Sequence, residues 1–401
     1  MSIRYALTPA GRGRRPRPPR IAGRLVAIAL MGVAIAVTGC GAAAVDAGDT
    51  PSAERAVGSS LPKRLPASRG TKRYVSPDGS DRSRGTAAAP WRTVQKALNT
   101  LRPGQTAIVR AGTYRQNLVA DRAGRKSAPI TISGEPGAVL AAGSGAEENM
   151  PLEMVDGAAF LRFEGLVFEG ATGDSTTNVY ADRGVHDIEL SRCEVRRSQR
   201  QGFFSEADTA RIQILRCRFH DNGGSGPEGL DHSIYVQGSR HVIAGNLLTG
   251  ARNGNGIQLY PSSDNAIIVG NTIDDNLLDG VVIGDDDGRT TSDALVANNI
   301  VTRSRSAVAT YWGGAVGRGN VVRNNLGWRN DRRRFAGEGA VWVGNRTADP
   351  RFVDAAAGDY HLSAGSPAIG RALERLTLPV DIDGRRRLRG VGRPDLGAYE
   401  R

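Results

Sequence analysis

One histidine of the chain stands beside a carboxylate and a phenol. His232 follows Asp231 and precedes Tyr235 in the stretch DHSIYVQG. An imidazole can accept a proton, a phenol can donate one, and a neighbouring carboxylate can orient the imidazole or raise its basicity. Arg305 opens a related segment farther along and would neutralise an acid group. We therefore predict that His232, Tyr235, Asp231 and Arg305 form a catalytic acid–base site.

A histidine satisfied by hydrogen bonds in a turn is the structural alternative. The segments that align with HSIYVQ begin with other polar residues: Thr177, Gln201, Asn255, Asp279 and Arg305. The fold therefore does not require histidine at this place. The gap before His232 is 31 residues, against 23 to 26 elsewhere, and contains DNGGSGPEGLD. Because function gathers on loops of a rigid scaffold, we expect this insertion to bring Asp231 and His232 to an accessible face.

Six aligned segments alternate apolar and other residues, as strands with one buried side do. The apolar columns begin at Val179 and Ala181 and end at Ala307 and Ala309. The outward columns are Tyr180, Phe204, Tyr235, Gln258, Val282, Val308, and Asp182, Glu206, Gln237, Tyr260, Gly284, Thr310. Aromatic rings stack on sugar C–H faces, and polar groups bond sugar hydroxyls. A solvated sheet face is the alternative to a glycan groove, whose predicted substrate-binding residues are Tyr180, Glu206, Gln237, Gln258, Tyr260 and Asp279.

Further carboxylates allow two other chemistries. Asp285, Asp286 and Asp287 in GDDDGRTTSD are hard oxygen ligands for Ca²⁺, although three adjacent acids cannot all point one way and a solvated turn is the alternative. Hydrolysis of a glycosidic bond needs two carboxylates, which Asp182, Glu206, Asp231 and Asp279 would supply from neighbouring repeats. The chain contains no phosphate loop, Cys/His metal motif or nucleophile elbow, so Ca²⁺ is the one cofactor considered.

A repeat of about 26 residues must position these side chains. Seven short segments of similar sequence recur along the chain. When they are aligned, one residue of each falls in the same column: Leu166, Cys193, Cys217, Asn246, Asn271, Asn299 and Asn325. Their separations are 27, 24, 29, 25, 28 and 26 residues, a period typical of solenoids. The segments are short and β-branched, with Gly, Asn and Asp between them, which predicts a parallel β-helix with stacked asparagines. The two cysteines would stack as free thiols, with a disulfide as the alternative.

Both ends of the repeat array add specific marks. Arg73–Tyr114 reads as a strand, a loop, a helix near residues 93–101 that caps the solenoid, and a strand ending in GTY. The tail contains YHLSAGSPAIG and DIDGRRRLRGVGRPDLGAYE. Residues 73–400 thereby resemble the right-handed parallel β-helix proteins of the pectate-lyase-like superfamily. The resemblance implies an all-β fold, and the superfamily includes lyases, hydrolases, esterases, epimerases and non-catalytic adhesins. GLDHSIYV also resembles the DPH region of mannuronan C5-epimerases through Asp231 and His232, without the proline.

The first residues carry a targeting pattern. A basic stretch through Arg24 precedes the apolar run LVAIALMGVAIAV and then VTGC, which resembles a bacterial lipoprotein signal with Cys40 as the lipidated residue. A membrane-spanning helix is the alternative. The net charge of +12 falls to +5 without residues 1–39, which hold seven arginines and no acid. We expect a signal at 1–39, a flexible tether at 40–71, the β-helix at 72–345 and a C-terminal segment at 346–401.

These observations predict an extracytoplasmic protein that contacts the membrane only through its lipid anchor. Its expected partner is an anionic polysaccharide, with no nucleic acid, and the chain is expected to be monomeric. A lyase acting on uronate-containing chains by β-elimination is the favoured activity. The alternatives are a non-catalytic glycan-binding or cell-surface protein, a C5-epimerase and a glycoside hydrolase.

Overall fold

The computed structural model describes residues 61–401, except 175, 225–228, 287, 333–334 and 391. The expected signal, its Cys40, most of the expected tether and Asp287 lie outside the described residues, so the predictions about them stay predictions. Within the described part of the chain, no helix is both long and apolar enough to cross a membrane.

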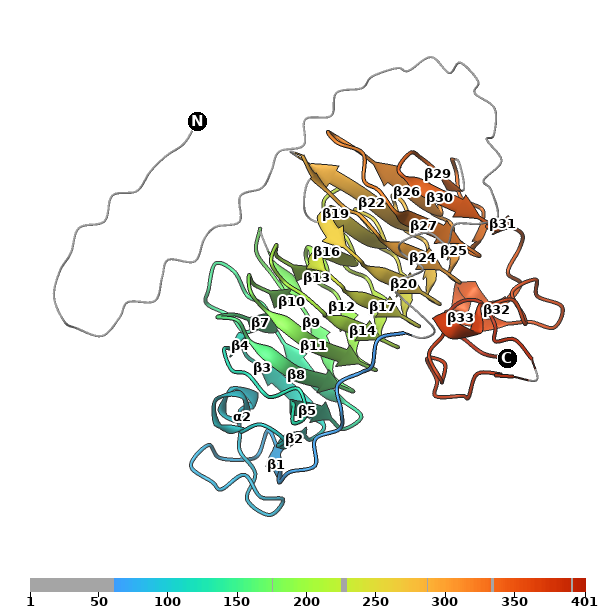
Figure 1. The fold of residues 1–401 in the computed structure, drawn as a ribbon. Coiled ribbons are helices and arrows are strands. Elements are labelled where there is room, and N and C mark those ends of the chain that lie inside the picture. Colours follow the sequence, from blue (N-terminus) through green and yellow to red (C-terminus); the bar gives the residue numbers. More distant parts are fainter. Residues whose placement is uncertain (1–60, 175, 225–228, 287, 333–334, 391) are drawn as a thin grey trace, which may run out of the picture. The chain divides into compact units, whose positions relative to one another are not determined.

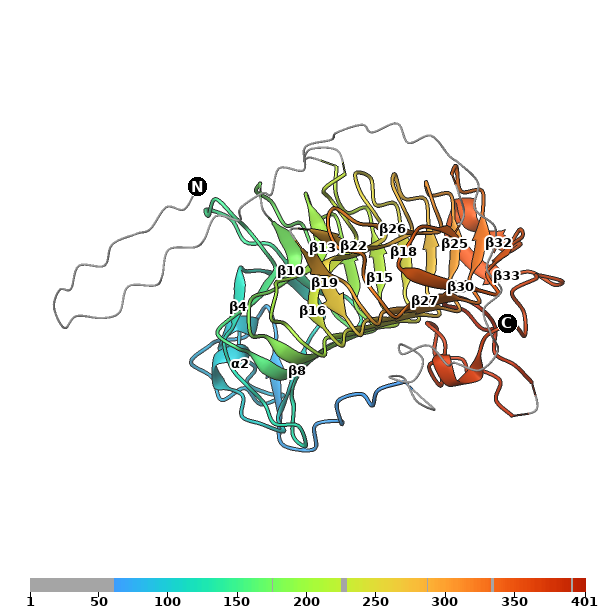
Figure 2. The same ribbon diagram turned by 45° about the horizontal axis from the view of Figure 1, so that its top comes forward.

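The described residues fold into a parallel β-helix with three sheets, as predicted (Figure 1). Successive coils contribute strands to the three sheets, and within each sheet the strands of adjacent coils pair in parallel, whereas β23 and the β32–β33 pair are antiparallel. Figure 2 shows the coils stacked side by side. This stacking brings residues about 25 positions apart in sequence into neighbouring places, which is why columns in the sequence become rows on a face.

The first sheet consists of β1 (Lys72–Val75), β2 (Thr106–Val109), β5 (Ile130–Gly134), β8 (Ala159–Glu164), β11 (His186–Ser191), β14 (Gln213–Leu215), β17 (Val242–Ala244), β20 (Ile267–Val269), β24 (Leu295–Ala297), β27 (Asn320–Arg323) and β30 (Ala340–Val343). The second consists of β4 (Leu118–Ala120), β7 (Leu152–Met154), β10 (Thr177–Ala181), β13 (Gln201–Ser205), β16 (Ile234–Ser239), β19 (Ile257–Asp264), β22 (Val281–Asp286), β26 (Val308–Tyr311) and β29 (Phe335–Ala336), with β23 (Arg289–Thr290) antiparallel to β22. The third consists of β3 (Gly112–Arg115), β6 (Ala138–Ala141), β9 (Val167–Glu169), β12 (Glu194–Arg196), β15 (Arg218–His220), β18 (Leu247–Thr249), β21 (Thr272–Asp274), β25 (Ile300–Thr302), β28 (Leu326–Trp328) and β31 (Arg346–Thr347).

An asparagine ladder joins successive coils, as the repeat predicts. The side-chain amide of Asn246 donates to Asn271 Oδ1 at 3.0 Å, Asn271 donates to Asn299 at 2.9 Å, and Asn299 donates to Asn325 at 2.9 Å. The ladder continues to Asn345. These amides are buried, so the bonds satisfy groups that water cannot reach. In the same column Cys193 and Cys217 are buried free thiols, as favoured above.

The predicted cap is the helix α2 (Val94–Thr100). Thr93 is its N-cap and accepts a hydrogen bond from the backbone N–H of Lys96. Val94, Ala97 and Leu98 are buried in the same core as the strands, so the helix covers the apolar end of the first coils.

The two flanks differ from a simple tether and cap. Residues 61–71, expected to belong to a free tether, lie against the solenoid: Arg64 pairs with Glu189, and the Ser68 hydroxyl donates to Pro129 O at 2.7 Å.

The C-terminal segment contains β32 (Phe352–Asp354), β33 (Asp359–Leu362) and two 3-10 turns, Ala355–Ala357 and Glu374–Leu376. Leu376 packs on the outer side of the first sheet, and other residues of the segment pack on the third. Among the described residues, these clusters contain none that packs on the outer face of the second sheet.

Candidate functional site

The outer face of the second sheet carries the aromatic side chains predicted for it, and the predicted strand phase is right for five of the six segments. Val179, Phe203, Ile234, Ile257 and Val281 stand in one register and are buried in the core. The last segment is displaced by one residue. Val281 pairs with Val308, so Val308 replaces Ala307 in the inward row and Ala309 replaces Val308 outside. Ala307 and Val308 are both small and apolar, so alternation alone could not fix this phase.

Four aromatic rings form a continuous row on this face. The centroid of Tyr180 lies 5.8 Å from that of Phe204, Phe204 lies 4.8 Å from Tyr235, and Tyr235 lies 6.5 Å from Tyr260. The rings come from the adjacent strands β10, β13, β16 and β19. Tilted contacts at these distances hold the rings in place against one another. We call Tyr180, Phe204, Tyr235 and Tyr260 the aromatic row.

Acidic and amide groups flank the aromatic row. The Tyr180 hydroxyl donates to Glu206 Oε1 at 3.2 Å, Tyr235 is partnered by the amides of Gln258 and Gln237, and Tyr260 is partnered by Asp286. Burial raises the pKa of all three phenols, and the nearby carboxylate of Glu206 or Asp286 raises it further. The phenols are therefore neutral near pH 7 and can act as hydrogen-bond donors and proton donors.

His232 lies beneath this row rather than on an accessible loop, so that part of the prediction is wrong. Its side chain is buried, with 1% exposure, and its ring meets Tyr235 edge-on at 5.3 Å. Nδ1 accepts the backbone N–H of Asn255 at 3.0 Å, which places the imidazole proton on Nε2. Burial lowers the pKa of His232 to about 4. In this geometry His232 supports Tyr235 and has no free nitrogen for accepting a substrate proton.

Asp231 is also buried, with 0% exposure, and not on the accessible face. Its Oδ1 accepts from Arg200 Nε at 2.5 Å, and its Oδ2 accepts from the Asn253 amide at 2.9 Å. Asp231 is thus paired with Arg200, and its charge raises the pKa of His232 only in part against the larger lowering by burial. The sequence could not reveal this pairing, because Arg200 and Asp231 approach only through coil stacking.

Arg305 and Asp279 pair with each other. The Arg305 guanidinium contacts both oxygens of the buried Asp279 carboxylate. Arg305 lies opposite Leu278, one position before the predicted column, because of the displaced last strand. Asp279 therefore does not face substrate, and the charge of Arg305 is largely compensated by Asp279.

In the acidic turn, the carboxylates of Asp285 and Asp286 point in different directions, as the alternation of side chains along a strand requires. Asp285 is buried, its Oδ1 accepts from Gly313 N–H at 2.6 Å, and its Oδ2 has no partner among the described residues. Asp286 reaches the outer face at Tyr260. The described residues contain no group of three or more His, Cys, Asp or Glu side chains arranged to hold a metal ion. The two described acids of this turn thus do not form the expected Ca²⁺ cluster.

Two contributors were not predicted. Arg289 on β23 lies close enough to the Tyr235 phenol to lower its pKa, which opposes the effect of burial. Its signal in the sequence was only that it follows the acidic turn. Asn255 connects the buried layer to the groove: its N–H binds His232, and its amide donates to Gln258 Oε1 at 2.6 Å. The buried polar layer thereby fixes the groove side chains from behind.

Comparisons with known proteins agree with this fold. The family model described as Pel9A-like, right handed beta helix region matches residues 73–253. A solved structure of pectate lyase Pel9A has a TM-score of 0.53 at 15% identity, covering 82% of this chain and 96% of that one. A rhamnogalacturonan lyase has a TM-score of 0.51 at 13% identity, covering 69% and 74%. Pectate lyase PEL9 of Emericella nidulans is 41% identical over 61 residues, 15% of each chain. The chain spans less than a sixth of the curated relatives it matches. The protein is a right-handed parallel β-helix, the fold that it shares with these structures.

Proposed function

We propose that the protein cleaves a uronate-containing polysaccharide by β-elimination in the groove formed by the aromatic row. The proposal rests on three kinds of side chain that the second sheet and its β23 extension provide. Glu206 offers a carboxylate, Tyr235 a neutral phenol and Arg289 a cation. The names of the structural neighbours, a pectate lyase and a rhamnogalacturonan lyase, support elimination over the other activities considered.

The three groups match the needs of the reaction. Arg289 would neutralise the uronate carboxylate and so acidify the neighbouring C–H. Glu206 would take that proton, the C–O bond to the leaving sugar would break, and a carbon–carbon double bond would form in the ring. Tyr235 would donate its proton to the leaving oxygen, and the catalyst would be restored when protonated Glu206 gives its proton to solvent and the Tyr235 phenolate takes one back. Tyr180 would hold Glu206 through its 3.2 Å hydrogen bond. His232, Asn255 and Gln258 would position Tyr235.

Hydrolysis is the second candidate, because one observation favours it. Ala181 pairs with Ser205, which places Asp182 and Glu206 on adjacent coils at about one strand spacing, ~4.8 Å between backbones. Retaining glycosidases hold two carboxyl groups about 5–5.5 Å apart. Asp231 and Asp279 are excluded from such a pair because each is buried against an arginine.

One assay separates these activities. The protein is incubated with a panel of uronate polymers, once with added Ca²⁺ and once with EDTA. Ultraviolet absorbance and the number of reducing ends are followed over time. Elimination produces both signals, hydrolysis only reducing ends, and a glycan-binding protein neither. C5 epimerisation would change the polymer's NMR spectrum without new ends. Reducing ends without absorbance would contradict the elimination mechanism.

Variants test the assignment of residues. We expect Glu206→Gln to reduce turnover about a hundredfold or more with an unchanged melting temperature, the usual effect of losing a positioned base. Tyr235→Phe keeps the stacked ring and should reduce turnover while binding persists. Glu135→Gln removes the same charge from an exposed site away from the groove and should be neutral. Full turnover by Glu206→Gln would exclude Glu206 as the base.

We also propose that this site operates outside the cytoplasm on a lipid-anchored protein. The lipoprotein-like signal ending at Cys40 supports this location, and a polymeric substrate is consistent with it. We also propose that Ca²⁺ supports the reaction, because a cation attracted by the carboxylates of this face would bridge to the uronate. The arm of the assay with EDTA tests this dependence.

A further inference from the structure

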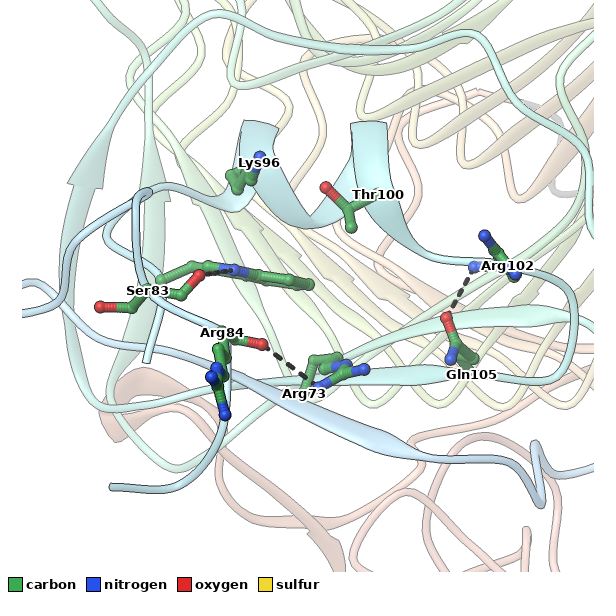
Figure 3. A pocket seen from close by; sticks show the side chains of 8 residues that line it. Arg73, Ser83, Arg84, Lys96, Thr100, Arg102 and Gln105 are labelled. Atoms are coloured by element: carbon green, nitrogen blue, oxygen red, sulfur yellow. Dashed lines mark hydrogen bonds between the residues drawn. The ribbon is translucent and has the colours of Figure 1, made fainter. Parts of the chain in front are cut away.

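A second concave site lies at the N-terminal cap, outside the groove. It has a volume of about 470 Å³ and lies between α2, the loop before it and the first strands. Figure 3 shows Lys96 and Thr100 on the helix, Arg73 and Gln105 across from them, and Ser83 and Arg84 at one side. Arg102 and Trp91 complete the lining. The volume falls within the range of small-molecule sites, about 300–1,000 Å³. We call this site the cap pocket.

All charged residues that line the cap pocket are positive. Arg73, Arg84, Lys96 and Arg102 line it, and no acidic residue does. Within the described residues none of these four cations forms an ion pair; Arg73 donates to the Arg84 carbonyl at 3.2 Å, and no side-chain bond is seen for the other three. Four cations that line one concavity with no carboxylate among the lining residues repel one another, so an anion placed there would be stabilised.

Asp81, which the charge of Lys96 reaches, is engaged at the start of α2. Asp81 accepts the backbone N–H groups of Arg92 and Thr93 with Oδ1 and the Thr93 hydroxyl with Oδ2. Asp81 thus serves the start of α2 and lies outside the lining of the pocket. Burial raises the pKa of Asp81, but the hydrogen bonds from Thr93 and Arg92 outweigh burial and lower it, and the charge of Lys96 adds to the lowering. The remaining positive charge of the pocket has no partner among the described residues.

The other lining groups favour a sugar over a bare ion. Ser83, Thr100 and Gln105 add hydroxyl and amide groups beside the cations. Trp91 is 3% exposed and anchored by its indole N–H to Ser83 O at 3.0 Å, so the wall is rigid. Arginine and lysine bind carboxylates, while hydroxyl and amide groups match sugar hydroxyls. α2 is itself fixed to the groove sheet, because Gln95 exchanges two 2.8 Å bonds with Val119 of β4.

We propose that the cap pocket is an accessory subsite that binds the acidic group and hydroxyls of a saccharide unit of an anionic polysaccharide. This assignment deepens the proposed function and rests on it for the class of polymer. Binding here would hold the polymer on the protein at a second point and raise the effective concentration of its other units at the groove.

Calorimetry tests the subsite in a groove variant, Tyr235→Ala, so that the remaining binding reports the cap pocket. The probes are galacturonate and mannuronate trimers, the same trimers with carboxyl groups reduced to alcohols, inorganic sulfate, and vesicles containing anionic phospholipid. We expect one acidic trimer to bind with an affinity that falls as NaCl rises, and its reduced form not to bind at the same concentration.

Two matched double variants locate the binding. Arg73→Gln with Lys96→Gln should weaken the trimer about tenfold or more, the effect of losing charge-assisted hydrogen bonds. Arg122→Gln with Lys126→Gln removes the same charge from exposed positions outside the pocket and should change affinity less than about twofold. If the first pair destabilises the fold, Arg84→Gln with Arg102→Gln replaces it, because both side chains are exposed.

Several outcomes would overturn the assignment: no binding by either trimer, equal binding of the reduced trimers, or equal loss in both double variants. Sulfate binding as tightly as the trimers would mean an adventitious ion only. Binding seen only with anionic vesicles would assign the pocket to a membrane surface. Trimer binding at the pocket without any turnover by the wild type would refute the proposed function alone, whereas turnover with an empty pocket would refute the subsite alone.

Discussion

Two buried histidines should make the protein lose stability as the pH falls from about 6.5 to 4. His232 and His241 are both fully buried, and burial lowers the pKa of each from 6.5 to about 4. Each Nδ1 accepts a backbone N–H, from Asn255 at 3.0 Å and from Ile212 at 3.2 Å. A proton on Nδ1 would face that N–H and break the bond, which gives the lowered pKa a structural cause.

The sign and size of the effect follow from proton linkage. Between pH 6.5 and 4 the unfolded chain binds a proton on each histidine and the folded chain does not, so the free energy of unfolding falls as the pH falls. The contribution is fully present above pH 6.5 and is lost as the pH falls to about 4. A lowering of about 2.5 units corresponds to ~3 kcal/mol for each histidine. Two such losses are large beside a total stability of about 5–15 kcal/mol.

Other groups contribute differently in the same window. The pKa of His220 is raised, chiefly by its hydrogen bond to Glu194, so its contribution is present below pH 6.5 and lost as the pH rises. His220 therefore opposes the trend and remains constant between variants. Urea unfolding of the wild type, His232→Asn and His241→Gln at pH values from 7.5 to 4.5 gives the slope for each protein.

Each substitution should remove a similar share of the slope, whatever it does to stability at pH 7.5, because only the titrating group is lost. The double variant should lose both shares. A slope that is the same in the wild type and both single variants would refute the reasoning, since it would assign acid unfolding to carboxylates.

Two further predictions concern the core and the anchor. Leu259 is buried inside β19, so Leu259→Asp should lower the free energy of unfolding by several kcal/mol, whereas the outward Gln258→Ala should cost about 1 kcal/mol for its lost hydrogen bonds; equal effects in urea unfolding would contradict the strand phase. Cys40→Ala should release the full chain from the membrane fraction or block its processing; unchanged retention with an intact N-terminus in mass spectrometry would favour a membrane-spanning helix.

The repeat made the fold predictable because identical demands recur in every coil. A buried bend needs an amide that can bond the next coil, so Asn246, Asn271, Asn299 and Asn325 recur at one column and reveal the period. Alternation then separated core from surface in β10 through β22, where the inward places are apolar except for Ser205. In β26 the run SAVAT has small apolar residues in both phases, and the register was decided by pairing with β22.

The aromatic row was predictable for the same reason, since stacking turns a column of the sequence into a row on a face. The state of each charged group was not predictable. Asp231 and His232 sit in a glycine-rich stretch that reads as a loop, yet Arg200 neutralises Asp231 and Asn255 binds His232, and both become buried support. These partners lie 31 and 23 residues away along the chain and meet only across adjacent coils.

Local sequence thus determined the coil, its core and the residues that the groove displays, because hydrophobic alternation and backbone hydrogen bonding are local and repeated. Tertiary structure alone decided which charges are paired. Arg305 is paired with Asp279, whereas the charge of Arg289 acts on the pKa of Tyr235, and no carboxylate lines the cap pocket beside its cations. An ion pair forms only when two charged groups on adjacent coils lie within a few ångströms of each other. The sequence of one coil does not show which charged group of the next coil comes that near.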